Sequence, residues 1–187
     1  MQEISFTSAI RPIPVSEFNK LASAMGEKFH AAYPWNFESG KVGADVFTKN
    51  VVDCTSCVIS DGKRAIMMHL TPDDELNHSR YFLREYLRNN FGLNNPNMSA
   101  IVLGSKKTVP SLNIFKNFVE LLKDAQVPFS ILKTAKTPFH VAYKSNTDTV
   151  YISSFGMEDG LLKGKSSNEV LKSLFEKVEI SKFDEIA

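Results

Sequence analysis

The sequence predicts a layered α/β (α+β) protein, a β-sandwich of mixed or antiparallel strands flanked by helices. Three observations carry this prediction. Several short segments are apolar at consecutive positions, as in strands that are covered on both sides. Short turn signals join several of these segments, which favours antiparallel or mixed pairing. Other segments space their apolar residues as helices do.

The first half of the chain yields a short strand at residues 4–7, which Pro12 and Pro14 separate from a helix beginning at Ser16. Trp35 is expected to pack at the edge of the core. The remaining segments of this half are, in order, an apolar run at 45–59, a strand at 64–70, a loop from Pro72, and a helix from about 79 to 90.

The second half alternates strand and helix patterns and then becomes charged. The expected total is seven or eight strands and four helices. The predicted segments are, in order, a strand buried on both faces at 99–104, a helix from 111 to 122, strands at 127–132, 139–143 and 149–153, a helix at 168–177, and a helix end or tail at 176–187.

Length and composition suit one domain over residues 1–187, because 187 residues with 43% apolar content can bury a core. A net charge of +1 gives no general attraction to phosphates or anionic lipids, so neither a nucleic acid nor a membrane is expected as a partner. The N-terminus lacks the pattern of a signal peptide, and no apolar stretch would span a bilayer. We therefore expect folding in a reducing cytoplasm.

Cys57 and His69 are the most informative residues. Cys57 lies in an apolar run before an Asp61-Gly62 turn signal, and His69 lies in the next apolar run, so adjacent strands could bring thiol and imidazole together. The imidazole would lower the thiol pKa and later protonate a leaving amine. The backbone N–H groups of Ser56 and Cys57 would hold the oxyanion. Such a set suits attack on an amide or ester.

Strand alternation sets a condition on this pair. A plain two-residue turn at Asp61-Gly62 would send His69 to the face opposite Cys57. A three-residue loop would place Cys57 opposite Met67, with His69 a diagonal neighbour on the same face, about 7–8 Å away at Cα. The catalytic interpretation therefore predicts an odd loop or a bulge, with Gly62 left-handed.

Other interpretations of Cys54 and Cys57 stay open. Either cysteine could be a small core residue, and His69 a satisfied core group. A redox pair would normally open a helix, whereas Val58 continues a strand. A zinc site needs more ligands, and no second CxxC or HxxxH exists, so no metal or cofactor is expected. If Cys57 is the nucleophile, it should be the more reactive thiol.

The segments Ser56-Cys57-Val58 and Met68-His69-Leu70-Thr71-Pro72, joined by the turn, resemble the core of the cysteine glutamine deamidases. That family includes the chemoreceptor deamidase CheD, the catalytic domain of cytotoxic necrotizing factor and the Burkholderia lethal factor. The resemblance covers about residues 45–155, between an N-terminal helical extension and a C-terminal helical tail. It implies a layered β-sandwich in which Cys57 is the nucleophile and His69 the general acid/base.

The chain departs from the family in two places. CheD and the lethal factor orient the histidine with a threonine where this chain has Val51. Thr48, Thr55 or a main-chain carbonyl such as that of Val51 are the candidates for this third member. The glycine expected beside the nucleophile is replaced as well, because Thr55 and Ser56 precede Cys57.

The implied reaction hydrolyses a glutamine side-chain amide of a protein to glutamate, without a cofactor. The extensions are not CheD-like, so the first hypothesis is a monomeric bacterial effector or toxin, a virulence hydrolase. It would be made in the bacterial cytoplasm and secreted without a cleavable signal into a host cell cytoplasm to act on a host protein. The second hypothesis is a CheD-type chemoreceptor deamidase. The third is a non-catalytic protein-binding module on the same fold.

Overall fold

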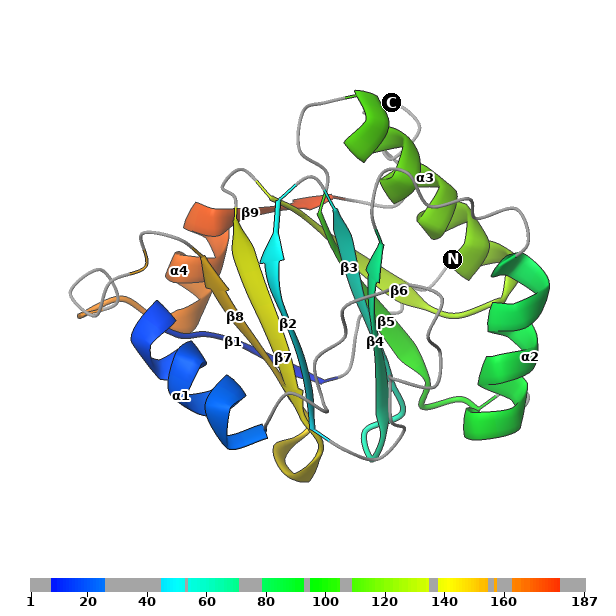
Figure 1. The fold of residues 1–187 in the computed structure, drawn as a ribbon, viewed down its shortest axis with the longest axis horizontal. Helices are drawn as coiled ribbons and strands as arrows, with labels where there is room; N and C mark the ends of the chain where they lie inside the picture. The colour runs from blue at the N-terminus through cyan, green and yellow to red at the C-terminus, as the bar shows by residue number, and fades with distance from the viewer. Residues whose placement is uncertain are drawn as a thin grey trace.

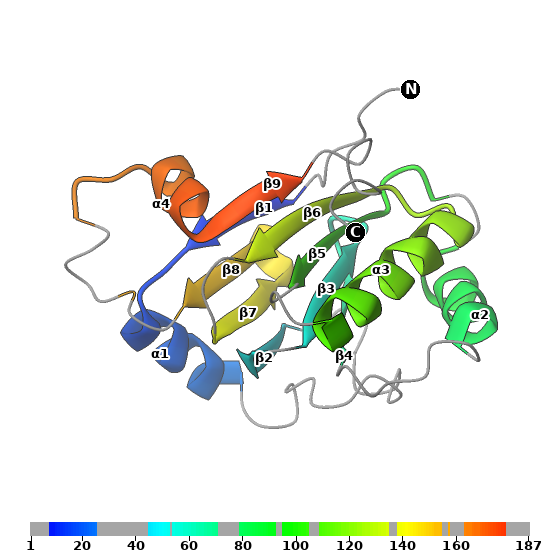
Figure 2. The same ribbon diagram turned by 90° about the horizontal axis from the view of Figure 1, so that it is seen from above.

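Two β-sheets pack face to face and carry helices on their outer faces (Figures 1 and 2). A computed structural model describes residues 8–25, 45–52, 54–70, 79–92, 95–104, 109–134, 138–154, 157 and 163–178. The first sheet has the order β1 (Ala9–Pro12), β8 (Thr149–Ser154), β7 (Phe139–Lys144) and β2 (Val46–Val51). The second has the order β4 (Ala65–Leu70), β3 (Thr55–Ser60), β5 (Ser99–Gly104), β6 (Phe129–Thr134) and β9 (Phe175–Val178).

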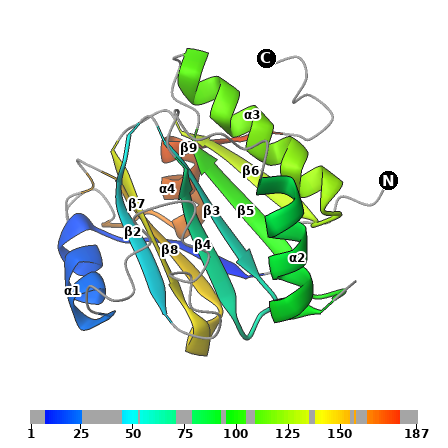
Figure 3. The same cartoon turned by 45° about the vertical axis from the view of Figure 1, so that its right-hand side comes forward.

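Most neighbouring strands are antiparallel; β1 with β8 and β5 with β6 are the parallel pairs. The helices are α1 (Val15–Met25), α2 (Ser79–Phe91), α3 (Val109–Asp124) and α4 (Ser167–Leu174). Figures 2 and 3 show α1 on the first sheet, α2 and α3 on the second, and α4 beside β9. No helix in this described part is long and apolar enough to cross a membrane.

The sheets divide the core into layers. The layer between the two sheets, called here the inter-sheet core, includes Val58, Met67 and Val141. The layer between the second sheet and α2 and α3, called here the helix-side core, includes Cys57 and Met68. A smaller cluster joins the first sheet to α1. The side on which a strand residue points therefore decides which core it enters.

The predicted α/β architecture of two mostly antiparallel sheets flanked by helices is confirmed. The strands expected at 64–70, 99–104, 139–143 and 149–153 are present, as are the helices from Ser16 and from about Ser79. The expected strand at 4–7 and the packing of Trp35 lie outside the described residues.

The prediction was wrong at both ends of the chain. Pro12 closes a strand rather than breaking one, which is tolerated because β1 is an edge strand. The last helix ends at Leu174, and β9 follows where a longer helix and a charged tail were expected. The strand forms because the edge of β6 offers a partner, with Ile131 opposite Val178. Strands from outside residues 45–155 thus complete both sheets.

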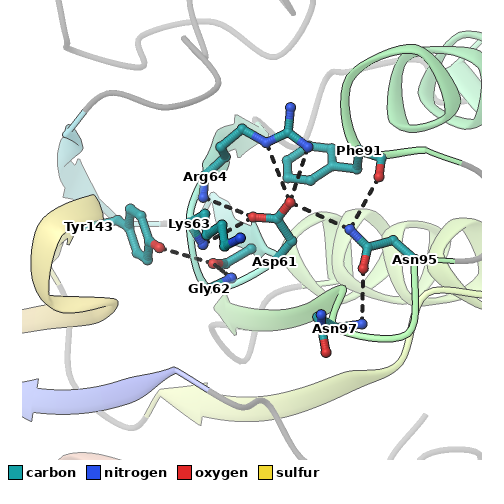
Figure 4. Close-up of polar contacts among 9 residues, drawn as sticks. Asp61, Gly62, Lys63, Arg64, Phe91, Asn95, Asn97 and Tyr143 are labelled. Atoms are coloured by element: carbon teal, nitrogen blue, oxygen red, sulfur yellow. Dashed lines mark hydrogen bonds and ion pairs between the residues drawn. The ribbon is translucent and has the colours of Figure 1, made fainter.

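Buried hydroxyl groups link the two sheets at the turn end of β3. Ser60 Oγ lies 3.0 Å from Tyr143 Oη of β7, and Tyr143 donates to Asp148 Oδ1 at 2.9 Å. Figure 4 shows the Tyr143 ring reaching across to this turn. Burial, followed by the influence of Asp148, raises the pKa of Tyr143, so its hydroxyl keeps the proton that it donates.

The β3–β4 hairpin has an even register. Ser56 lies opposite His69 and Cys57 opposite Met68, with Ser60 and Ala65 closing the ladder. The prediction of an odd loop is therefore wrong. The left-handed conformation of Gly62 is confirmed, with φ at 83°.

The carboxylate of Asp61 explains the register. Asp61 Oδ1 accepts hydrogen bonds from the backbone N–H groups of Lys63 and Arg64 at 3.0 and 2.9 Å, and Asp61 N donates to Arg64 O. This side-chain cap centres the turn on Gly62 and Lys63 rather than on Asp61 and Gly62. The Arg64 guanidinium and the Asn95 amide also reach the carboxylate (Figure 4).

We predict that Asp61→Asn destabilises the fold in a pH-dependent way. Burial would raise the pKa of Asp61, but the hydrogen bonds from Lys63 and Arg64 outweigh it and hold that pKa below its usual value. A depressed pKa stabilises the fold above the unfolded value, about 3.9, and this stabilisation is lost as the pH falls through the folded pKa. The free energy of unfolding at pH 7 should drop by about 1–2 kcal/mol.

Urea unfolding from pH 7 to pH 3 would measure this effect. The deficit of Asp61→Asn should shrink toward the acid end, whereas Glu85→Gln, at an exposed position on α2, should show no such trend. A deficit of the same size at every pH would contradict the proposed role of the carboxylate charge.

Candidate functional site

Cys57 and His69 point to opposite faces of the second sheet. Cys57 packs beside Ile59 and Met68 in the helix-side core and is 0% exposed. Burial raises the pKa of its thiol well above the ordinary value. A thiol that is buried, protonated and on the far face from the imidazole is a poor nucleophile. The predicted shared face of Cys57 and His69 is therefore wrong, and Cys57 packs in the core. That Cys57 is the more reactive thiol stays a prediction, which this burial argues against.

The backbone around Ser56 and Cys57 is also unsuited to the predicted oxyanion role. β3 is paired with β4 on one side and β5 on the other at both residues. Their N–H groups therefore lie within the ladders of an interior strand, where cross-strand carbonyls are the partners. A substrate oxygen could not bind them without breaking the sheet.

His69 points into the space between the sheets and meets Thr48. The Thr48 Oγ1 and His69 Nδ1 atoms are 2.7 Å apart. Thr48 belongs to β2 at the edge of the first sheet, and His69 to β4 at the edge of the second. Figure 3 shows these two edge strands side by side. Thr48 is fully buried and His69 is partly exposed, so the hydrogen bond joins the core to the surface.

Of the three candidates for orienting the histidine, Thr48 is the one that a described contact joins to His69. Thr55 shares the face of Cys57, because it lies opposite Leu70, and its hydroxyl has no hydrogen-bond partner. Val51 buries its side chain in the inter-sheet core at the end of β2. The geometry thus favours Thr48 as the orienting group.

Cys54 is a candidate site residue that the sequence reasoning passed over. Its side chain is partly exposed and packs against the inter-sheet core, the side to which His69 also points. It lies two residues before Ser56, and Ser56 is directly opposite His69. Strand alternation could have indicated this, because Cys54 and Cys57 are separated by an odd number of positions and so face opposite ways. Neither Cys54 nor Cys57 forms a disulfide bond.

The backbone at Cys54 is closely packed against β5. A Cβ atom added at Gly104 would lie 3.1 Å from the Cys54 carbonyl oxygen and 3.0 Å from Thr55 Oγ1. Such contacts are tighter than most real Cβ contacts, so glycine allows this close approach without displacing its neighbours. Cys54, which directly precedes β3, is therefore packed closely against the end of β5.

Ser56 contributes a hydroxyl on the same side. Ser56 is fully buried, lies opposite His69, and its Oγ has no hydrogen-bond partner among the described residues. A buried hydroxyl without a partner costs about 1–3 kcal/mol. Ser56 can therefore offer a hydrogen bond to a polar group held beside His69. Cys54, Ser56, His69 and Thr48 together place a thiol, a hydroxyl and an oriented imidazole along one layer.

The described residues hold no group of three or more histidine, cysteine, aspartate or glutamate side chains able to bind a metal ion. No protein-family model matches the chain, and no curated protein matches it. The resemblance to the glutamine deamidases therefore rests on the residue pattern alone.

We predict that Cys54 is the thiol modified in the native protein. A maleimide or iodoacetamide should label Cys54, whereas Cys57 should stay protected until the protein is unfolded, because it is buried and its pKa is raised. Peptide mass spectrometry before and after denaturation measures both sites. Cys57→Ala should keep the labelling of Cys54, and equal native labelling of the two cysteines would contradict the assignment.

Proposed function

We propose that the chain is a cysteine-dependent protein-glutamine deamidase in which Cys54, not Cys57, is the nucleophile. His69 is the general acid/base and Thr48 orients it. The observation that carries this proposal is the 2.7 Å contact between Thr48 and His69, on the side of the sheet where Cys54 packs. An imidazole fixed by a third group beside a cysteine is the arrangement that thiol catalysis uses.

The reaction follows from these groups. In the tautomer that this step needs, His69 Nδ1–H donates to Thr48 Oγ1, and the unprotonated Nε2 takes the proton of the Cys54 thiol. The thiolate attacks the carbon of the glutamine side-chain amide, and the proton passes from His69 to the leaving nitrogen, which departs as ammonia. Water then attacks the thioester with His69 as base. The products are glutamate and the free Cys54 thiol.

The negative charge on the amide oxygen needs a donor in the transition state. The predicted backbone groups of Ser56 and Cys57 are held in the sheet, so the Ser56 hydroxyl is the candidate that replaces them. Its unpaired Oγ and its position opposite His69 support this role.

A glutamine of a protein is the proposed substrate because the segments around Ser56 and His69 resemble those of the deamidases. The substrate is proposed to be a host protein, with the chain exported from a bacterium without a cleavable signal. The strands outside residues 45–155, β1 and β9, are built into the two sheets, which supports a chain organised differently from CheD. A CheD-type reaction on chemoreceptors remains the alternative substrate assignment.

A non-catalytic protein-binding module is the second candidate. One observation favours it: Cys57, the cysteine at the position that matches the deamidase motif, is a packing residue. The two candidates differ in one measurable property, because a binding module needs no coupling between the Cys54 thiol and the His69 imidazole.

We predict that activity depends on Cys54 and His69 but not on Cys57. Host lysate is incubated with the protein, and glutamine-to-glutamate conversion is sought by peptide mass spectrometry; chemoreceptor fragments are a second substrate set. Cys54→Ala should abolish conversion, and His69→Ala should lower it by about 10²–10⁴-fold. Cys57→Ala is the matched control and should retain conversion.

The same variants test the alternative. In the wild-type protein, the alkylation rate of Cys54 should rise with pH at an apparent pKa that shifts in His69→Ala. Identical alkylation profiles for the two proteins, together with no conversion in either substrate set, would overturn the enzyme proposal and leave the binding module.

A further inference from the structure

His140 lies on the opposite side of the first sheet from Thr48. It belongs to β7, faces Ser153 of β8 across the ladder, and is buried. Its ring stacks at a tilt of 34° against Phe18 of α1, with the ring centroids 5.3 Å apart. The His140 ring is therefore packed between the first sheet and α1.

A backbone amide of β2 donates a hydrogen bond to the ring. His140 Nδ1 accepts a hydrogen bond from the backbone N–H of Asn50 at 3.0 Å. Asn50 is left-handed, with φ at 57°, and lies where the β2–β7 register shifts between Thr48 and Val51. A bulge takes one residue out of the ladder and leaves its amide without a strand partner. The imidazole of His140 supplies the partner that the ladder cannot.

The bulge begins directly after Thr48. Thr48 is the last residue of β2 in register before it, opposite Val141. A bulge bends its strand and redirects the side chains beside it. The conformation of Asn50 therefore influences the position of the Thr48 hydroxyl between the sheets. Through that position it influences the contact between Thr48 and His69.

We propose that His140 is a positioning residue for the Thr48–His69 pair, acting through the amide of Asn50. This inference rests on the proposed function for its catalytic meaning, but the coupling itself is a property of the fold. The hydrogen bond requires a neutral ring with an unprotonated Nδ1, since an imidazolium has two donors and no acceptor. Protonation of His140 at low pH should therefore break its hydrogen bond with Asn50 and loosen the bulge.

The surroundings of His140 keep the ring neutral near pH 7. Burial first, and then the Lys49 ammonium of β2, lower the pKa of His140. The other groups that face it are Phe18 of α1 and Ser153 of β8, and neither carries charge. With the folded pKa below the unfolded value of about 6.5, the stabilisation is complete above that value and is lost as the pH falls toward the folded pKa.

Two substitutions separate the acceptor from the packing. His140→Phe keeps an aromatic ring against Phe18 but has no acceptor. His140→Asn places an amide oxygen near the position of Nδ1, accepts the Asn50 hydrogen bond, and does not titrate. Thr48→Val is the positive control, because it removes the contact to His69 directly.

The experiment follows the His69 ring by NMR as the pH is varied, together with the rate of Cys54 alkylation, on variants that unfold cooperatively. His140→Phe should shift the His69 titration in the same direction as Thr48→Val and slow Cys54 alkylation about tenfold or more. His140→Asn should match the wild type at pH 7 in both measurements. It should lack the change in the His69 signals at low pH that protonation of His140 causes in the wild type.

A folded His140→Phe protein with a wild-type His69 titration would overturn the inference. So would a His140→Asn protein that keeps the wild-type low-pH change, which decides the matter even if His140→Phe fails to fold. Failure of the proposed function would give a different result: His69→Ala would then leave the rate of Cys54 alkylation unchanged. The titration of His69 in the His140 variants would still report whether His140 acts on His69.

Discussion

The register of the β3–β4 hairpin is the constraint on which the candidate site depends. The Asp61 carboxylate caps the turn and sets Ser56 opposite His69. A shift of one residue between β3 and β4 would turn the side chains of one strand over relative to the other. Because β3 is also held by β5, His69 would then point to the face opposite Ser56. The chemistry available between the sheets is thus decided at a turn several residues away from it.

The inter-sheet core is mainly apolar, and hydrogen bonds between side chains cross it. Thr48 meets His69 near one edge of the sandwich, and Ser60 meets Tyr143 at the turn end of β3. Each contact joins a strand of the first sheet to a strand of the second. Because an unpaired polar group in such surroundings is costly, these contacts restrict how the sheets can slide. The place of the His69 ring is therefore a property of the whole sandwich.

Local patterns in the sequence were enough for most of the fold. Strands such as β5 and β7 are covered on both sides, and that condition leaves a continuous apolar run that can be recognised in one chain. β9 could not be recognised in this way. It has four residues, and it exists because β6 offers an open edge, which is a long-range condition.

The site was harder to predict than the fold. The Asp61-Gly62 signal located the hairpin, but the centre of the turn depends on which backbone amides the Asp61 side chain caps. Thr48 was a candidate from the sequence, yet its contact with His69 arises from the packing of two sheets. Neither fact is contained in residue spacing. Alternation alone, in contrast, required that Cys54 and Cys57 face different cores.

The cysteine that matches the deamidase motif is therefore not the cysteine that is placed to react. The segment that resembles the deamidases places its cysteine at residue 57, where burial raises the thiol pKa and the imidazole is on the far side of the sheet. The partly exposed thiol of Cys54 is on the side of the Thr48–His69 contact. A nucleophile needs access and a base more than it needs a place in a motif. Cys54, which has both access to solvent and an imidazole on its side of the sheet, is therefore the nucleophile that we propose for amide hydrolysis.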